Sequence, residues 1–136
     1  MKKIFALCTV ALLAVGVVFA QTSTEDAANP KVDISTQVRQ LDDNYADFHP
    51  TAKSVSLDLE YTPLTGEVII NYTCMAASFD QGEAMNTIDA ILEEFGIENQ
   101  FTRKPTFVRK DRIRYYKDGR DLRMATYRRC VRYDVR

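Results

Sequence analysis

The first of two neighbouring segments places apolar residues at alternate positions, and this two-residue period constrains the fold more than any other feature of the chain. The apolar residues of the first segment, residues 54–61, are Val55, Leu57, Leu59 and Tyr61. After a turn at residues 62–66, residues 67–76 are rich in β-branched and aromatic side chains, which favour strands. Alternation is typical of a strand with one buried face. The sequence therefore predicts a β-hairpin, and its second strand should be central because both of its faces are largely apolar.

A helix is predicted after this hairpin. The apolar residues that recur there at helical spacing are Met85, Ile88, Leu92 and Phe95. Either Asp80 or Ser78 can cap the start of the helix, because a short polar side chain accepts a hydrogen bond from a free backbone N–H group. Gly96 can end the helix in the left-handed conformation. The apolar stripe predicts that this helix packs on the sheet.

Two further strands are predicted at residues 106–116 and residues 121–133, which again mix aromatic and β-branched side chains with polar ones. The order is then two strands, one helix and two strands. We therefore expect an α+β fold with about four mainly antiparallel strands, arranged as two hairpins, and one helix packed on the sheet. The predicted domain covers residues 51–136.

The last two strands flank an Asp-Gly pair, Asp118 and Gly119, which is typical of a two-residue turn. Such a turn pairs Lys117 with Arg120. It also places Arg114 directly across from Arg123, where the two like charges repel unless an anion lies between them. The residues predicted to be buried on the other face of this hairpin are Ile113, Tyr115, Leu122 and Met124.

After Ala125 the apolar positions change from even to odd numbers, so either a β-bulge near Thr126 shifts the register or the strand passes onto another surface. We expect the bulge, which would gather the arginines on one face. Without the bulge, that face would mix Arg129 with Tyr127, Val131 and Tyr133 and would resemble a partly wet interface. Guanidinium groups pair with planar anions and stack on rings. The candidate residues for binding an anion or a partner are Arg112, Arg114, Tyr116, Arg123, Arg128 and Arg132.

The start of the chain predicts export. Lys2 and Lys3 precede an apolar stretch from Ile4 to Phe19, and a small residue, Ala20, offers a cleavage site. Residues 1–20 are therefore interpreted as a signal peptide, and cleavage after Ala20 should release a soluble periplasmic or secreted protein without a membrane span. Residues 21–50 are interpreted as an acidic leader, flexible in part. Within this leader, Ile34, Val38 and Leu41 allow a short helix.

Charge is divided unevenly along the chain. Residues 21–102 contain 3 basic and 15 acidic side chains, whereas residues 103–136 contain 13 basic and 4 acidic side chains. The two parts can neutralise each other in the fold, or the basic part can bind an anion. An exported protein seldom meets nucleic acid, so we expect an acidic protein, an anionic envelope polymer or a lipid headgroup as partner. A second copy of the chain, which would form a homodimer, is a further candidate for the partner.

Catalysis has little support in the sequence. The single histidine, His49, precedes a proline, and motifs for phosphate loops or hydrolases are absent. Asp89 and Glu93 share one side of the predicted helix, which is more typical of a solvated surface than of a metal site. No cofactor or metal is expected. Cys74 and Cys130 can form a disulfide in an oxidising compartment or remain as two buried thiols.

We therefore expect a small non-catalytic binding module of the cell envelope. Two alternatives stay open: a small periplasmic hydrolase or ligand carrier with an unrecognised pocket, and a purely structural protein whose charges pair internally.

Overall fold

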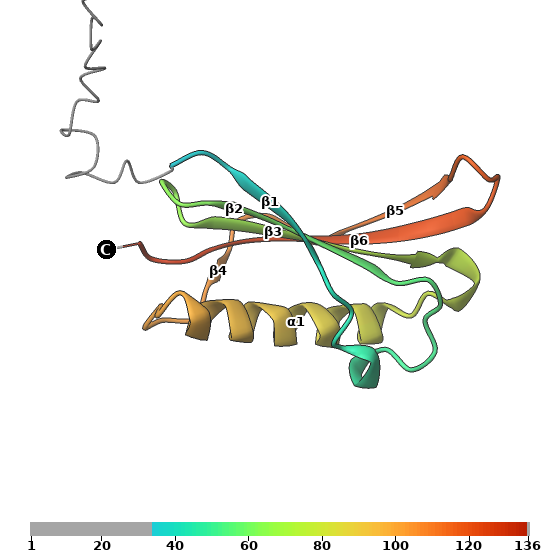
Figure 1. The fold of residues 1–136 in the computed structure, drawn as a ribbon, viewed down its shortest axis with the longest axis horizontal. Coiled ribbons are helices and arrows are strands. Elements are labelled where there is room, and N and C mark those ends of the chain that lie inside the picture. Colours follow the sequence, from blue (N-terminus) through green and yellow to red (C-terminus); the bar gives the residue numbers. More distant parts are fainter. Residues whose placement is uncertain (1–33, 136) are drawn as a thin grey trace, which may run out of the picture. The chain divides into compact units, whose positions relative to one another are not determined.

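The computed structural model describes residues 34–135, and it has one antiparallel sheet and one long helix (Figure 1). The predicted α+β class is confirmed, but the described sheet has six strands where about four were expected. The strands are β1 (Gln37–Leu41), β2 (Ser56–Thr62), β3 (Glu67–Met75), β4 (Thr106–Phe107), β5 (Arg112–Lys117) and β6 (Arg123–Arg132). The helix α1 spans Gln81–Glu98, and two short 3-10 helices cover Ala46–Phe48 and Ala76–Ser78.

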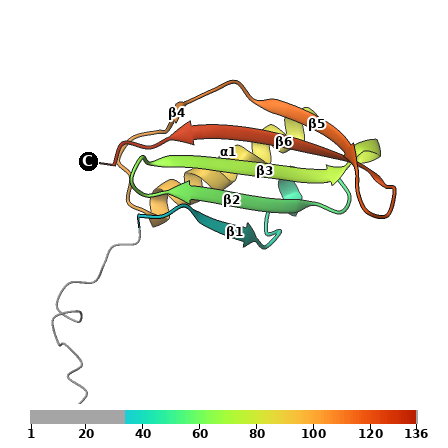
Figure 2. The same cartoon turned by 90° about the horizontal axis from the view of Figure 1, so that it is seen from above.

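The strands lie in the order β1-β2-β3-β6, and β4 and β5 both pair with the outer edge of β6 (Figure 2). The predicted hairpin of β2 and β3 is confirmed, and β3 lies between β2 and β6 as its two apolar faces indicated. Gly66 in the turn of this hairpin has φ of +70°, and an added Cβ atom would lie 2.3 Å from the carbonyl oxygen of Tyr133. The turn therefore depends on glycine for both its backbone conformation and its close contact.

The first strand replaces the short helix that the sequence allowed. Val38 and Leu41 belong to β1, which pairs antiparallel with β2 from Gln37 opposite Tyr61 to Leu41 opposite Leu57. The helical interpretation was wrong because a sheet edge offers these residues a full ladder of backbone hydrogen bonds, whereas a weak apolar stripe offers a short helix little stabilisation. The sheet thus begins within the predicted leader, before residue 51.

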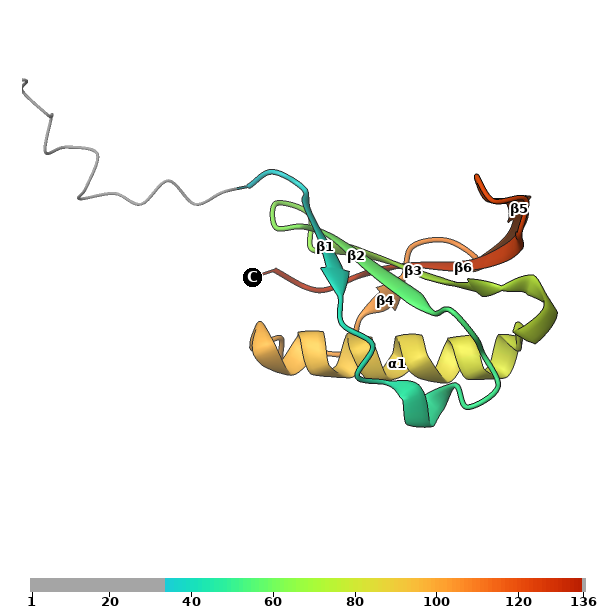
Figure 3. The ribbon, with the colours of Figure 1, turned by 45° about the vertical axis from the view of Figure 1, so that its right-hand side comes forward.

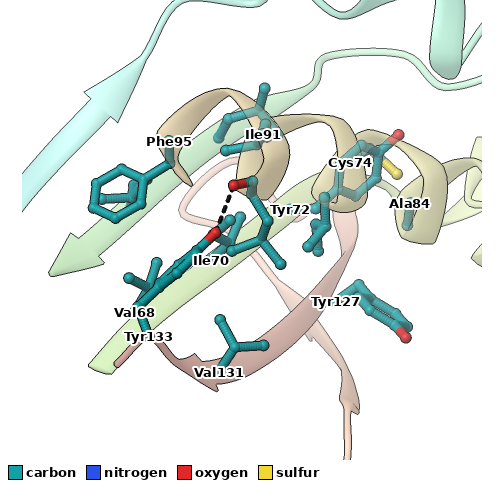
Figure 4. Close-up of a cluster of buried hydrophobic side chains, with 14 residues drawn as sticks. Val68, Ile70, Tyr72, Cys74, Ala84, Ile91, Phe95, Tyr127, Val131 and Tyr133 are labelled. Atoms are coloured by element: carbon teal, nitrogen blue, oxygen red, sulfur yellow. Dashed lines mark hydrogen bonds between the residues drawn. The ribbon is translucent and has the colours of Figure 1, made fainter. Parts of the chain in front are cut away.

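The helix covers one face of the sheet (Figures 1 and 3). Among residues 34–135 no helix lies on the other face, which we call the bare face. The covered face holds the core, where Val68, Ile70 and Tyr72 of β3 are fully buried against α1 (Figure 4). Burial of a fully apolar side chain such as Val68 or Ile70 contributes about 1.5–3 kcal/mol. Tyr133, which follows β6, donates its hydroxyl to the carbonyl of Leu92 at 2.5 Å, and burial raises the pKa of Tyr133 to about 12.

The start of α1 agrees with the sequence prediction and its end does not. Asp80 is the N-cap, and its side chain accepts a hydrogen bond from the backbone of Glu83 at 2.9 Å. Gly96, however, lies inside the helix. The left-handed residue at the end is Gln100, with φ of 57°, and the backbone N–H of Phe101 bonds to the carbonyl of Gly96 at 2.9 Å. This closing pattern satisfies the last carbonyls and lets Phe101 pack under the helix end.

The hairpin of β5 and β6 has a different register from the predicted one. Lys117 pairs with Arg123, and the loop between Asp118 and Leu122 has three residues. Asp118 accepts hydrogen bonds from the backbone N–H groups of Leu122 and Arg120, each at 2.9 Å, and these bonds lower the pKa of Asp118. Asp118 thus occupies the first position of a β-turn, which the hydrogen bond from the Asp121 N–H to the Asp118 carbonyl closes at 3.0 Å. Asp121 follows at φ of 61°, and the Asp-Gly pair does not form a two-residue turn.

This change of register moves side chains between the faces of the sheet. Of the four residues predicted to be buried, Ile113, Tyr115 and Leu122 are exposed, because the hairpin extends past the N-terminal start of α1 (Figure 1). The expected bulge is also absent from the described strands, since β6 pairs continuously with β3 and with β5. Without a bulge, Arg129 shares one face with Tyr127 and Val131, as the alternative interpretation expected. That face, however, is the buried one under α1 and not the face of Arg112 and Arg114.

Cys74 and Cys130 are free thiols, so of the two options left open by the sequence the disulfide is not formed. Cys74 lies on the covered face of β3, and Cys130 lies on the bare face of β6, with its thiol 3.1 Å from Glu67 Oε1. Side chains on opposite faces of a sheet cannot be bridged, because their Cβ atoms point apart. The alternative of two buried thiols agrees with the structure.

The predicted signal peptide, residues 1–20, lies outside the described residues, as does the leader up to residue 33. Among residues 34–135, no helix combines the length and the apolar character that a membrane crossing requires.

Candidate functional site

The bare face of the sheet holds a hollow at the place where the edge strand leaves β6. Between β4 and β5 the chain bows away from β6 (Figure 2). The hollow has a volume of about 620 Å³. It is lined by five cationic residues and four polar or weakly polar ones, which are Arg109, Lys110, Arg112, Arg114, Arg128, Asn71, Tyr116, Thr126 and Cys130.

The side chains of this basic hollow come from three neighbouring strands and one loop. Strand pairing places Asn71, Arg128 and Arg112 in one row, from β3 through β6 to β5. The next row contains Thr126 and Arg114, and Thr126 is anchored by a 2.9 Å hydrogen bond to Thr73. Because alternate residues of a strand point to the same face, all of these side chains project from the bare face.

Most of the positive charge in the basic hollow is not neutralised within the described residues. No carboxylate lies within ion-pair distance of Lys110, Arg112, Arg114 or Arg128 among residues 34–135. Arg109 is the exception, since its guanidinium lies 3.5 Å from Glu67. Arg112 and Arg128 are directly opposite each other in the ladder, and like charges in this position are destabilising unless an anion lies between them.

The thiol of Cys130 lies at the margin of this site. Its burial, and then its hydrogen bond to the carboxylate of Glu67, raise the pKa of Cys130 to about 11. The thiol is therefore protonated at neutral pH and is not a ready nucleophile. Glu67 is held by Arg109 and by Arg132, whose guanidinium lies 3.8 Å away.

Five of the six candidate residues from the sequence lie on the bare face. Arg112, Arg114, Tyr116 and Arg128 line the basic hollow, and Arg132 lies on the same face of β6 beyond it. Arg123 does not join them. It pairs with Lys117 at the end of the hairpin, and its guanidinium lies 5.7 Å from the ring centre of Tyr115.

The sequence analysis did not find Arg109 and Lys110, because residues 106–116 were taken as one continuous strand. A signal was present: Arg109 and Asp111 interrupt the odd-numbered apolar positions of that segment. This interruption coincides with the bow between β4 and β5.

The interruption also supplies an internal partner for a buried charge, which the sequence did not predict. Arg129 is 3% exposed and donates hydrogen bonds to Asp111 Oδ2 from Nε at 3.0 Å and from Nη2 at 2.8 Å. Asp89 of α1 contacts its Nη1, and Tyr127 donates its hydroxyl to Asp111. Burial disfavours the charged guanidinium, but these carboxylates more than offset the effect and raise the pKa of Arg129.

The single histidine is not placed for general-base chemistry on a bound substrate. His49 is buried, its Nε2 lies 2.8 Å from Asp43 Oδ1, and its ring packs edge-on against Tyr72 at 5.7 Å. His49 lines neither the basic hollow nor the two other hollows described for residues 34–135, one near the end of α1 and one beside β1. The residue thus anchors the segment between β1 and β2 against the core.

Asp89 and Glu93 do not form part of a metal centre in the described region, where no group of three metal-ligating side chains occurs. Both residues line a second hollow of about 560 Å³, near the end of α1. Its wall includes aromatic rings, among them Phe101 and Phe107, and cations as well as carboxylates. The mixed charge of this hollow does not select one class of ligand.

Comparison of the chain with family models, with curated proteins and with solved structures returns no match, so the function has to be inferred from the surface itself.

Proposed function

We propose that this protein is a small exported binding module of the cell envelope, which holds an anionic group of its partner in the basic hollow. The proposal rests on one observation. Five cations converge on one hollow, and no carboxylate lines it. Three of them, Arg112, Arg114 and Arg128, stand on a rigid sheet and can each present two parallel N–H donors to a carboxylate or phosphate.

The placement of these cations favours ligand binding over a purely structural role. A structural arginine is satisfied within the fold, as Arg129 is by Asp111 and Asp89. Arg112 and Arg128 instead face each other across two strands. An anion between them would remove their repulsion, so binding would stabilise the folded protein.

A non-catalytic role is part of the proposal. The basic hollow offers donors but no general base or activated nucleophile, because the only thiol at its margin, Cys130, has a raised pKa. The buried position of His49 also leaves the hydrolase alternative without an observation that favours it. Export rests on the basic and apolar start of the chain and on the small residue Ala20.

Retention on two anionic resins, one bearing phosphate and one bearing carboxylate groups, tests the proposal. The double variant Arg114→Glu/Arg128→Glu should elute at clearly lower salt than the wild-type protein, because it reverses two charges inside the hollow. The matched control is Arg123→Glu/Lys104→Glu, which changes the net charge by the same amount. Arg123 lies on the hairpin away from the hollow, and Lys104 lies in the connection from α1 to β4.

The control variant should elute near the wild-type salt concentration. If both variants lose retention to the same extent, net charge and not the basic hollow explains binding, and the proposal is wrong. Thermal unfolding of each variant should be compared, because a loss of retention is informative only for a folded protein.

A further inference from the structure

The bare face of the sheet is divided by charge along the line of β3. On one side, β2 directs Asp58 and Glu60 to this face, as shown by the 3.2 Å hydrogen bond from Asn71 to Glu60. On the other side, β6 and β5 direct Arg128 and Arg112 to the same face. The strand between them carries neutral side chains in this region. One face thus has an acidic half and a basic half.

The two halves do not neutralise each other within one chain. Asp58 and Arg128 share a row, with Asn71 between them, so they are separated by two strand spacings, about 10 Å. No cation lies within ion-pair distance of Asp58 or Glu60 among residues 34–135. Each half therefore presents its charge to whatever covers the face.

We infer that a second copy of this chain covers the bare face, with a two-fold axis running parallel to β3. Rotation about such an axis exchanges the two sides of the sheet and keeps positions along the strands. Asp58 of one copy then lies over Arg128 of the other, and the same pair is repeated on the other side of the axis. Gln40 of β1 lies over Arg112 in the same row.

The direction of the axis follows from the charges. An axis perpendicular to the strands would place β2 of one copy over β2 of the other, and Asp58 would then face acidic side chains. With the parallel axis, β3 of one copy lies over β3 of the other, and the charged residue of β3 on this face is Glu67. Arg109 and Arg132 of the same chain already neutralise that carboxylate, so the two copies of Glu67 can lie near each other. Packed sheets lie about 10 Å apart and cross at about 30°, which allows these long side chains to meet.

The size of the face indicates a weak dimer. Five strands, β1, β2, β3, β6 and β5, span a width of about 24 Å, and nine residues of β3 span about 30 Å. The flat footprint is therefore about 700 Å² for each copy, below the roughly 800 Å² of a standard interface. Because the paired residues are mostly polar, we expect association in the micromolar range or weaker, and we expect salt to weaken it.

This inference rests on the proposed function, since the anion beside Arg128 would be Asp58 of the second copy. Sedimentation of the purified protein at low ionic strength, over a series reaching high-micromolar concentration, tests it. The single variants Asp58→Arg and Arg128→Asp should each weaken dimerisation about tenfold or more, because each turns two attractions into two repulsions.

An equimolar mixture of the two single variants should restore dimers, because both cross-pairs in the mixed dimer join one arginine with one aspartate and are again attractive. The double variant Asp58→Arg/Arg128→Asp should dimerise fully, because both of its pairs are attractive. A merely structural effect of either substitution would not be rescued by mixing two separately folded chains. A wild-type protein that stays monomeric over the whole series, or a double variant that does not recover dimers, would overturn the inference.

The variant Asp58→Ser separates this inference from the proposed function, because it removes the acidic partner and leaves the basic hollow intact. Loss of dimers with retained binding to the phosphate resin supports both the two-fold dimer and the proposed anion binding in the basic hollow. Unchanged dimerisation in this variant overturns the two-fold arrangement, while the resin comparison of the Arg114 and Arg128 variants still decides the proposed function.

Discussion

Removal of Asp111 should destabilise the protein strongly, because this carboxylate is the main partner of a buried charge. Arg129 is 3% exposed, and its guanidinium makes three charged hydrogen bonds, two with Asp111 and one with Asp89. Asp111→Ala leaves a buried guanidinium with a single carboxylate partner, and that partner, Asp89, is 62% exposed. Loss of one member of a buried ion pair costs about 3–5 kcal/mol. Because Asp89 remains, we expect the lower end, about 3 kcal/mol.

A loss of this size is easy to measure in a domain of about 100 residues. It corresponds to a decrease in melting temperature of about 12–24 °C, since 1 kcal/mol shifts the midpoint of such a domain by about 4–8 °C. Urea unfolding followed by circular dichroism gives the free energy directly. The matched control is Asp89→Ala, which removes a mostly exposed partner and should cost about 1 kcal/mol or less.

The double variant Asp111→Ala/Arg129→Met tests the physical reason for this loss. If an uncompensated buried charge is the cause, an apolar side chain at position 129 should recover much of the stability lost in Asp111→Ala. An Asp111→Ala protein that loses less than about 1 kcal/mol, or a double variant no more stable than the single one, would refute this explanation.

Two further predictions concern alkaline pH and export. Folding raises the pKa of Cys130 from 9.0 to about 11 and that of Tyr133 from 10.0 to about 12, so the unfolded chain loses these protons first. The contribution of these two groups to the free energy of unfolding is therefore fully present below pH 9 and should be lost as the pH rises from about 9 to 12. Urea midpoints that stay constant over that pH range would contradict this prediction. For export, the mature protein recovered outside the cytoplasm should begin at Gln21, which N-terminal sequencing checks, and an intact product starting at Met1 would contradict it.

Much of the candidate site was found from the sequence, although part of the reasoning was wrong. The expected bulge near Thr126 was meant to bring Arg128 and Arg132 beside Arg112 and Arg114. These residues do share a face, but the cause is the three-residue loop after Asp118, which shifts the hairpin register and changes the faces. The same shift removes Arg123 from the group. The like-charged pair across the hairpin is therefore Arg112 with Arg128.

The loop could not be assigned from its residues because Asp-Gly is compatible with more than one turn. In the sequence, Asp118 fits the centre of a two-residue turn. In the structure, its side chain accepts two backbone hydrogen bonds that only a longer loop can provide. Hydrogen bonds that form only after the strands pair are not visible in a local pattern.

What the sequence determined by itself was the identity of the main strands, the helix, its N-cap and the clustering of basic residues late in the chain, because these follow from local periodicity and composition. Tertiary structure decided the register of β5 and β6, the use of residues 37–41 as an edge strand, and the pairing of buried Arg129 with Asp111 and Asp89. The physical reason is that a shift of one residue in a strand changes the face of every side chain, while the local pattern changes little. Strand pairing therefore decides which arginines are satisfied by carboxylates inside the fold and which remain free to bind an anion.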